Sequence, residues 1–216
     1  MRISAVAFDL DGTLVDSRQD LAAAINLMRG DLGLPALSLE AVVGMVGEGV
    51  RVLVRRALGG EPEPELFARA LRCFLEHYER LCTEKTRPYS GVPEALAALG
   101  ERYPLGLLTN KPEHLTRRIL DHLGLLASFR ALVCGDTLPV RKPDPEVARH
   151  LAGQLGVTVE EMVLVGDSAI DAAAAEASGC RFILVDWGYA QPEEREKLRA
   201  DRRVSTPAEL LRALLS

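Results

Sequence analysis

The sequence predicts an α/β fold, a doubly wound parallel sheet with an inserted all-helical domain. From Gly91 onward, short apolar runs alternate with helical segments, which is typical of parallel strands covered by helices on both faces. The apolar run from Ile3 to Phe8 predicts a further buried strand of the same sheet. The residues between these two parts show only helical periodicity. We therefore expect residues 1–15 and 87–216 to form an α/β catalytic core, and residues 16–86 to form a helical domain inserted into it.

Four helices are expected in the insertion. Ser17 and Ser38 stand where a serine side chain can cap the start of a helix. Apolar residues follow them at the three- and four-residue spacing of amphipathic helices. The Gly47-Glu48-Gly49 sequence breaks this region in the middle. The expected helices run from Ser17 through Met28, from Ser38 through Val46, from Val50 to Leu58 and from Glu65 to Leu81.

Four further strands and four helices are expected in the core, in strict alternation. Each strand is a short continuous apolar run, as in a sheet buried on both faces. The expected strands are Leu105–Leu108, Ala131–Val133, Met162–Val165 and Phe182–Val185, and the expected helices are Val92–Leu99, Glu113–Leu123, Pro145–Leu155 and Ala169–Ser178.

Composition excludes several classes of protein. The net charge is −5 and no basic stripe is present, so a nucleic-acid partner is not expected. No apolar run approaches the ~20 residues of a membrane span, and no signal-peptide pattern opens the chain. The four cysteines are scattered without Cys-x-x-Cys spacing, which predicts reduced thiols and no zinc site. We expect a cytoplasmic protein, and both a monomer and a homodimer remain open.

Polar side chains follow four of the predicted strands. Because ligands bind outside the carboxyl ends of the strands of an open parallel sheet, these side chains are the candidate site. They are Asp9 and Asp11 after the first strand, Thr109, Asn110 and Lys111 after the second, Lys142 in the longer loop after the third, and Asp167, Ser168 and Asp171 after the fourth. Three acids for a cation, a hydroxyl and amides for an anion, and a lysine between them predict a site for Mg²⁺ and a phosphate group.

The predicted chemistry is phosphoryl transfer. Mg²⁺ prefers hard oxygen ligands, which Asp9, Asp167 and a backbone carbonyl near Asp11 can supply. With the metal and Lys142 neutralising the phosphate oxygens, a carboxylate can attack phosphorus, as aspartate does in other covalent mechanisms. A second acid two residues on can protonate the leaving group and then deprotonate the attacking water, which is worth about 10²–10⁴-fold.

The remaining polar groups are assigned to the phosphate and to support of the ligands. The Thr109 hydroxyl and the Asn110 amide would hold a phosphate oxygen at the start of a helix, and Gly12 and Lys111 complete the predicted phosphate-binding set. Ser168-x-x-Asp171 fits a capping pattern at a helix start as well as a metal site. We assign both residues to capping or to support of the metal ligands rather than to the metal itself.

These residues resemble the motifs of the haloacid-dehalogenase-like phosphohydrolases over nearly the whole chain. Phe8-Asp9-Leu10-Asp11-Gly12-Thr13-Leu14 is similar to the first motif of that superfamily, Thr109 to the second, Lys142 to the third and Gly166-Asp167-Ser168-x-x-Asp171 to the fourth. The resemblance implies that Asp9 is the nucleophile and Asp11 the acid and base, that Asp9, Asp11 and Asp167 hold Mg²⁺, and that the insertion is a helical cap.

Within this superfamily the chain looks most like the phosphoglycolate phosphatases. The resemblance rests on Thr109-Asn110-Lys111-Pro112, Arg141-Lys142-Pro143-Asp144-Pro145, Val46-Gly47-Glu48-Gly49 and Trp187-Gly188-Tyr189. It implies hydrolysis of 2-phosphoglycolate to glycolate and phosphate. The substrate carboxylate would need a second cation, either Lys111 or an arginine of the insertion.

Other activities stay open. A phosphosugar phosphatase, a pyrophosphatase or a phosphomutase would use the same chemistry, whereas Asp11 argues against a dehalogenase, which lacks the second acid. Two non-enzymatic alternatives are a phospho-accepting receiver domain and a phosphate-binding regulator. The helical insertion does not suit a receiver, and every catalytic position is occupied, which argues against a regulator without turnover.

Overall fold

The computed structural model describes residues 3–215, which contain a six-stranded parallel sheet of strand order β5-β4-β1-β6-β7-β8. The central strand, β1, pairs with β4 on one side and with β6 on the other. The strands are β1 (Ala5–Phe8), β4 (Leu105–Leu108), β5 (Ala131–Val133), β6 (Met162–Gly166), β7 (Arg181–Val185) and β8 (Arg202–Val204). A doubly wound α/β core is thereby confirmed.

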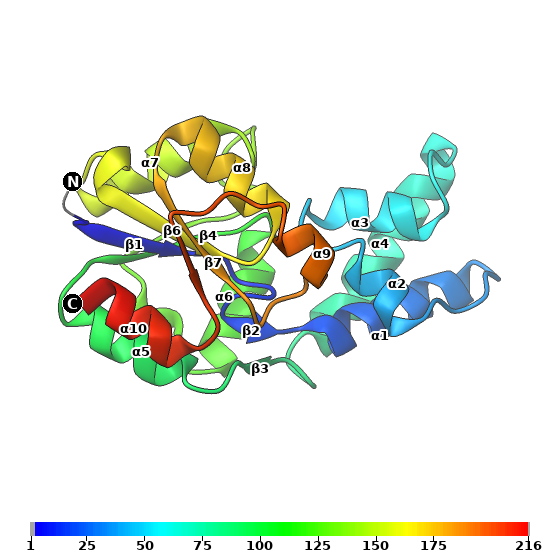
Figure 1. The fold of residues 1–216 in the computed structure, drawn as a ribbon. Coiled ribbons are helices and arrows are strands. Elements are labelled where there is room, and N and C mark those ends of the chain that lie inside the picture. Colours follow the sequence, from blue (N-terminus) through cyan, green and yellow to red (C-terminus); the bar gives the residue numbers. More distant parts are fainter. Residues whose placement is uncertain (1–2, 216) are drawn as a thin grey trace.

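Helices cover both faces of this sheet. In Figure 1, α7 (Pro145–Leu155) and α8 (Ala169–Ser178) lie over one face, and α5 (Val92–Gly100) and α10 (Pro207–Leu215) over the other. Each face has its own hydrophobic cluster, because the buried strand residues point alternately to the two sides. The core also contains α6 (Glu113–His122), α9 (Pro192–Arg195) and two short 3₁₀ helices, η1 (Leu126–Ser128) and η2 (Val159–Glu161).

The helical insertion leaves the core after β1 and returns before α5. Its helices are α1 (Arg18–Asp31), α2 (Leu39–Val43), α3 (Val50–Ala57) and α4 (Pro64–Leu81), and they lie to one side of the sheet in Figure 1. They share a third hydrophobic cluster, which Leu115 and Ile119 of α6 join from the core. The domain division at residues 16 and 86 stays a prediction.

The chain segments that enter and leave the insertion contact each other. A short antiparallel pair, β2 (Val15–Asp16) and β3 (Arg87–Pro88), joins the two chain segments. Next to it, the buried Asp20 carboxylate accepts the backbone N–H groups of Lys85 and Thr86 and the Thr86 hydroxyl. A buried carboxylate is stable when it accepts several such bonds, so this contact fixes the start of α1 against the returning chain.

Most predicted elements occur within one or two residues of their expected bounds, and three differences are informative. The first strand begins at Ala5 rather than Ile3. The second predicted helix ends at Val43 instead of reaching Val46, because Gly44 ends it. Ser38 caps that helix as predicted, whereas the Ser17 side chain makes no capping bond. The Ser17 hydroxyl donates to Asp11 instead.

Several further elements lie outside the predicted set, and of these only α10 has a clear sequence signal, the apolar spacing that follows Thr206-Pro207. They are the two-residue strands β2 and β3, the edge strand β8, and the helices α9 and α10. Within residues 3–215, no helix combines the length and the apolar character needed to cross a membrane.

Candidate active site

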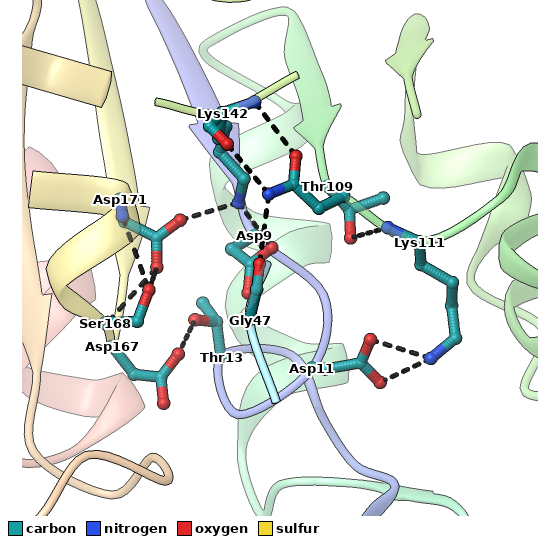
Figure 2. A network of polar contacts seen from close by, with 11 residues as sticks. Asp9, Asp11, Thr13, Gly47, Thr109, Lys111, Lys142, Asp167, Ser168 and Asp171 are labelled. Carbon is teal, nitrogen blue, oxygen red and sulfur yellow. Dashed lines mark hydrogen bonds and ion pairs between the residues drawn. The ribbon is translucent and has the colours of Figure 1, made fainter. Parts of the chain in front are cut away.

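The polar residues predicted from the strand ends meet at one edge of the sheet. Asp9 follows β1, Thr109 follows β4 and Asp167 follows β6, and these three strands are neighbours in the sheet. Lys142, from the loop between β5 and α7, lies in the same group of side chains (Figure 2). Parallel strands bring their carboxyl ends to the same edge, which explains why residues so far apart in the chain converge.

Lys142 lies between two carboxylates. Its Nζ is 2.7 Å from Oδ1 of Asp9 and 2.6 Å from Oδ1 of Asp171, and its side chain is almost fully buried. Burial alone would lower the pKa of Lys142, but the neighbouring carboxylates of Asp171 and Asp9 raise it above its ordinary value. Lys142 is therefore a permanent buried cation beside the predicted nucleophile.

Asn110 fixes the backbone of Lys142. Its side-chain oxygen accepts the Lys142 N–H at 2.9 Å, and its side-chain amide donates to the Lys142 carbonyl at 3.0 Å. The same amide donates at 3.0 Å to the carbonyl of Gly47 in the insertion. The side chain of Asn110 therefore links the core to the insertion and positions Lys142, and the contact of the Asn110 amide with phosphate stays a prediction.

Three carboxylates form an acidic cluster. One oxygen from each of Asp9, Asp167 and Asp171 lies within 4.8 Å of the others, and all three residues are buried. Burial raises the pKa of Asp9 to about 7, against the lowering effect of Lys142. Burial, together with the Asp171 and Asp9 carboxylates, raises the pKa of Asp167 to about 8. When all three acids are ionised, one lysine cannot balance them, so the ionised cluster lacks positive charge.

This cluster fits a divalent metal ion. Hard carboxylate oxygens are the donors that Mg²⁺ prefers, and a dication would supply the missing charge. The predicted ligand set was Asp9, Asp11 and Asp167. The side chains group Asp171 with Asp9 and Asp167 instead, and the carboxylate of Asp11 points elsewhere. A contribution of Asp11 through its backbone carbonyl stays a prediction.

Asp171 also caps the helix α8. Its Oδ2 accepts the Ser168 hydroxyl at 2.6 Å and the Ser168 N–H at 3.2 Å, while the Ser168 hydroxyl oxygen accepts the Asp171 N–H. The capping box read from the sequence is thus confirmed. The other oxygen of Asp171 binds Lys142. Asp171 therefore both caps a helix and positions the lysine.

The Asp167 side chain is closely surrounded by two hydrogen-bond donors and two glycines. Its Oδ2 accepts the Tyr189 N–H at 2.6 Å, and the Thr13 hydroxyl donates to its Oδ1 at 3.3 Å. A Cβ atom at Gly12 or at Gly188 would overlap the Asp167 side chain, and Gly12 has a φ of +88°. Gly12 is therefore required for space and backbone conformation, and its predicted contact with phosphate stays a prediction.

Asp11 is turned away from the acidic cluster. Figure 2 shows its carboxylate facing Lys111, whose Nζ is 2.7 Å from Oδ2 and 2.9 Å from Oδ1. The Ser17 hydroxyl donates to the same carboxylate. The Thr109 hydroxyl accepts the Lys111 N–H at 3.2 Å and keeps its own proton for another acceptor. Lys111 was predicted as a substrate-binding cation, and in this structure its partner is Asp11.

Tyr189 is a residue that sequence reasoning did not assign to the site. Its backbone binds Asp167, and its hydroxyl accepts the Ser17 N–H at 2.7 Å. The Tyr189 and Ser17 hydroxyl oxygens are 3.2 Å apart. Since the single Ser17 hydroxyl proton goes to Asp11, Tyr189 is the donor in that pair. The available signal was the Trp187-Gly188-Tyr189 sequence, which begins two residues after the end of β7.

A cavity of about 560 Å³ adjoins these residues. The core contributes Asp9, Asp11, Thr109, Lys111, Lys142 and Asp167 to its lining. The insertion contributes the loop around Gly47 and apolar side chains such as Leu53 and Phe74. Reactive groups on one side and a mostly apolar wall on the other are typical of a small-molecule site.

Known proteins share both the sequence and the fold. A family model described as haloacid dehalogenase-like hydrolase matches residues 6–185. A phosphoglycolate phosphatase of Chromobacterium violaceum is 44% identical over 213 residues, covering 96% of this chain and 95% of that protein. One of Thiobacillus denitrificans is 41% identical over 212 residues, covering 96% and 93%.

A solved structure from Haemophilus somnus, described as a predicted phosphoglycolate phosphatase, superposes with a TM-score of 0.89 at 33% identity and covers 99% of this chain and 98% of its own. Together with the strand-end carboxylates and the buried lysine, these matches identify the chain as a member of the haloacid dehalogenase-like hydrolase family.

Proposed function

We propose that this hydrolase is a magnesium-dependent phosphatase of a small phosphorylated metabolite, which it hydrolyses through an aspartyl-phosphate formed on Asp9. The observation that carries the proposal is the environment of Asp9. Its buried carboxylate contacts Lys142 and belongs to a three-acid cluster beside a cavity. The similarity to named phosphatases supports the same reaction class.

Each residue contributes a separate function. One carboxylate oxygen of Asp9 attacks phosphorus, while Lys142 and the Thr109 hydroxyl bind the phosphate oxygens and stabilise the charge that moves during transfer. Asp9, Asp167 and the backbone carbonyl of Asp11 would hold Mg²⁺, which neutralises the phosphate oxygens when it is bound, and Asp171 would support these ligands by holding Lys142. Asp11 donates a proton to the leaving alkoxide and later takes one from the water that releases phosphate.

The insertion has the position of a cap. Its loop around Gly47 lines the cavity and is bonded to Asn110 of the core. We propose that the insertion excludes water during the first step and contributes to substrate choice. The four cysteines are free, which supports a location in a reducing compartment such as the cytoplasm.

The proposed substrate is 2-phosphoglycolate, which is hydrolysed to glycolate and phosphate. The first support is that relatives at 41–44% identity are named phosphoglycolate phosphatases. A second support is the cation that lines the cavity next to Asp11, because a substrate carboxylate needs a positive partner.

A phosphate-release assay tests this proposal. The purified protein is given 2-phosphoglycolate, several sugar phosphates and pyrophosphate, with Mg²⁺ and with excess EDTA. We expect release with Mg²⁺, greatest for 2-phosphoglycolate, and a loss of about 10³-fold or more in Asp9→Asn. Asp121→Asn, which alters an exposed aspartate, is the matched control and should keep full activity. Turnover that persists in Asp9→Asn or in EDTA would contradict the mechanism, and equal turnover of all esters would remove the substrate assignment.

A further inference from the structure

Lys111 is a nearly buried cation whose charge is balanced by Asp11. The side chains of Lys111 and Asp11 are 6% and 12% exposed, and the ammonium contacts both carboxylate oxygens. The ammonium also lies 4.9 Å from the centre of the Tyr78 ring, a favourable cation–π distance. Lys111 is thus held on one side by an aromatic face and on the other by an acid assigned to proton transfer.

The other cations that line the cavity differ from Lys111. Lys142 is held by Asp9 and Asp171. Arg56 pairs with Glu48 and is 42% exposed, and Lys197 is exposed on the polypeptide that follows α9. Among these residues, Lys111 alone has as its counter-ion a carboxylate that must face the leaving group.

We propose that Lys111 recognises the substrate carboxylate, and that this carboxylate replaces Asp11 as the partner of the ammonium. The inference rests on the proposed function, which gives proton transfer to Asp11 and a carboxylate to the substrate. A buried charge that loses its partner is strongly destabilised. Asp11 therefore leaves Lys111 readily only when another anion takes its place.

The chemistry of 2-phosphoglycolate suits this exchange. Its carboxylate carbon is two bonds from the ester oxygen, and Asp11 must face that oxygen to protonate it. Lys111 contacts Asp11 in this structure. A substrate carboxylate close to the ester oxygen is therefore also close to Lys111. One anion replaces another at the ammonium, and no covalent bond changes in this exchange. Asp11, released from Lys111, takes up a proton from water and turns toward the ester. An ester that lacks the carboxylate cannot replace Asp11, which then stays paired with Lys111. Recognition of the substrate carboxylate is therefore coupled to the release of Asp11 for proton transfer.

The test compares 2-phosphoglycolate with its neutral amide, 2-phosphoglycolamide, by kcat/KM in the presence of Mg²⁺. We expect the wild-type protein to prefer the acid by about 100-fold or more. Lys111→Met should reduce that preference to within about tenfold. In this variant the kcat/KM for the acid should fall by a much larger factor than that for the amide, because only the acid loses a charge partner. General damage to the site would lower both values together.

Matched variants separate the possible outcomes. Lys85→Met removes an exposed lysine that does not line the cavity and should keep the wild-type preference. If Lys111→Met does not fold, Lys111→Gln provides the same comparison. An equal loss for both esters, an unchanged preference, or a preference lost in Arg56→Met but kept in Lys111→Met would overturn the inference while the proposed phosphatase stands. A wild-type protein that hydrolyses both esters equally would also overturn it. Failure of the wild-type protein to hydrolyse either ester would instead contradict the proposed function.

Discussion

The acidic cluster predicts that the metal-free protein becomes less stable as the pH rises from 5 to 7. Asp9 and Asp167 have pKa values of about 7 and about 8, against 3.8 for an ordinary aspartate. Because both pKa values are raised on folding, the folded protein holds more protons than the unfolded chain in this window. The stabilisation is complete below pH 3.8 and is lost as the pH rises through 7 and 8.

The size of the effect follows from proton linkage. Each group contributes a slope of up to about 1.4 kcal/mol per pH unit. Over the two units from pH 5 to pH 7, the free energy of unfolding therefore falls by a few kcal/mol in total, on the order of the slope of one to two such groups. A protein of this size has a total stability of about 5–15 kcal/mol, so the change is large.

Urea unfolding in EDTA at pH 5, 6 and 7 measures this slope. Adding Mg²⁺ should restore more stability at pH 7 than at pH 5, because the metal competes with protons for the same carboxylates. Asp167→Asn should remove about half of the slope, while Asp121→Asn, at an exposed position, should keep it. A metal-free stability that is flat or rises between pH 5 and pH 7 would refute the reasoning, as would a slope unchanged in Asp167→Asn.

Three substitutions test the surrounding contacts. Lys142→Met leaves Asp9 and Asp171 without their cation. In EDTA at pH 8 we therefore expect urea unfolding to show a free energy of unfolding lower by about 3–5 kcal/mol, with a smaller loss at pH 5 and no phosphatase activity. A stability equal to wild type at pH 8 would contradict this. Gly12→Ala places a Cβ against the Asp167 carboxylate at a φ of +88°, so we expect a cost of about 1–3 kcal/mol and weaker Mg²⁺ binding by calorimetric titration; wild-type affinity would count against the packing argument. Tyr189→Phe removes the acceptor of the Ser17 N–H. It should lower the free energy of unfolding in urea by about 1 kcal/mol, and it should lower kcat for alkyl phosphates more than for p-nitrophenyl phosphate. Tyr89→Phe is its control, since the buried Tyr89 hydroxyl has no partner among the described residues, and equal effects of the two changes would refute the role of Tyr189.

Much of the core was predictable because its strands are buried on both faces and read as short apolar runs. Leu105–Leu108 and Ala131–Val133 have the bounds expected from the sequence. The edge strand β8 reads Arg-Arg-Val, and such a strand has no apolar run to mark it. The pair β2 and β3 has two residues in each strand and depends on contacts between distant parts of the chain.

The convergence of the candidate site residues was predictable, whereas the direction of individual side chains was not. Asp9, Thr109, Lys142 and Asp167 converge because parallel strands end at one edge of the sheet. The pairing of Asp11 with Lys111 joins residues 100 positions apart. It also depends on how each side chain turns within the site. For the same reason the sequence could not show that Asp171, and not the Asp11 carboxylate, completes the acidic cluster.

The central claim is that Asp9 becomes phosphorylated during turnover, and chemical trapping tests it most directly. The protein is mixed with 2-phosphoglycolate and Mg²⁺, quenched in acid within milliseconds, and treated with borohydride, which reduces an aspartyl-phosphate to homoserine. Peptide mass spectrometry then locates the modified position. The account predicts homoserine at position 9 in the wild-type protein and none in Asp9→Asn. Homoserine at another aspartate, or continued phosphate release with no modified residue at any quench time, would contradict it.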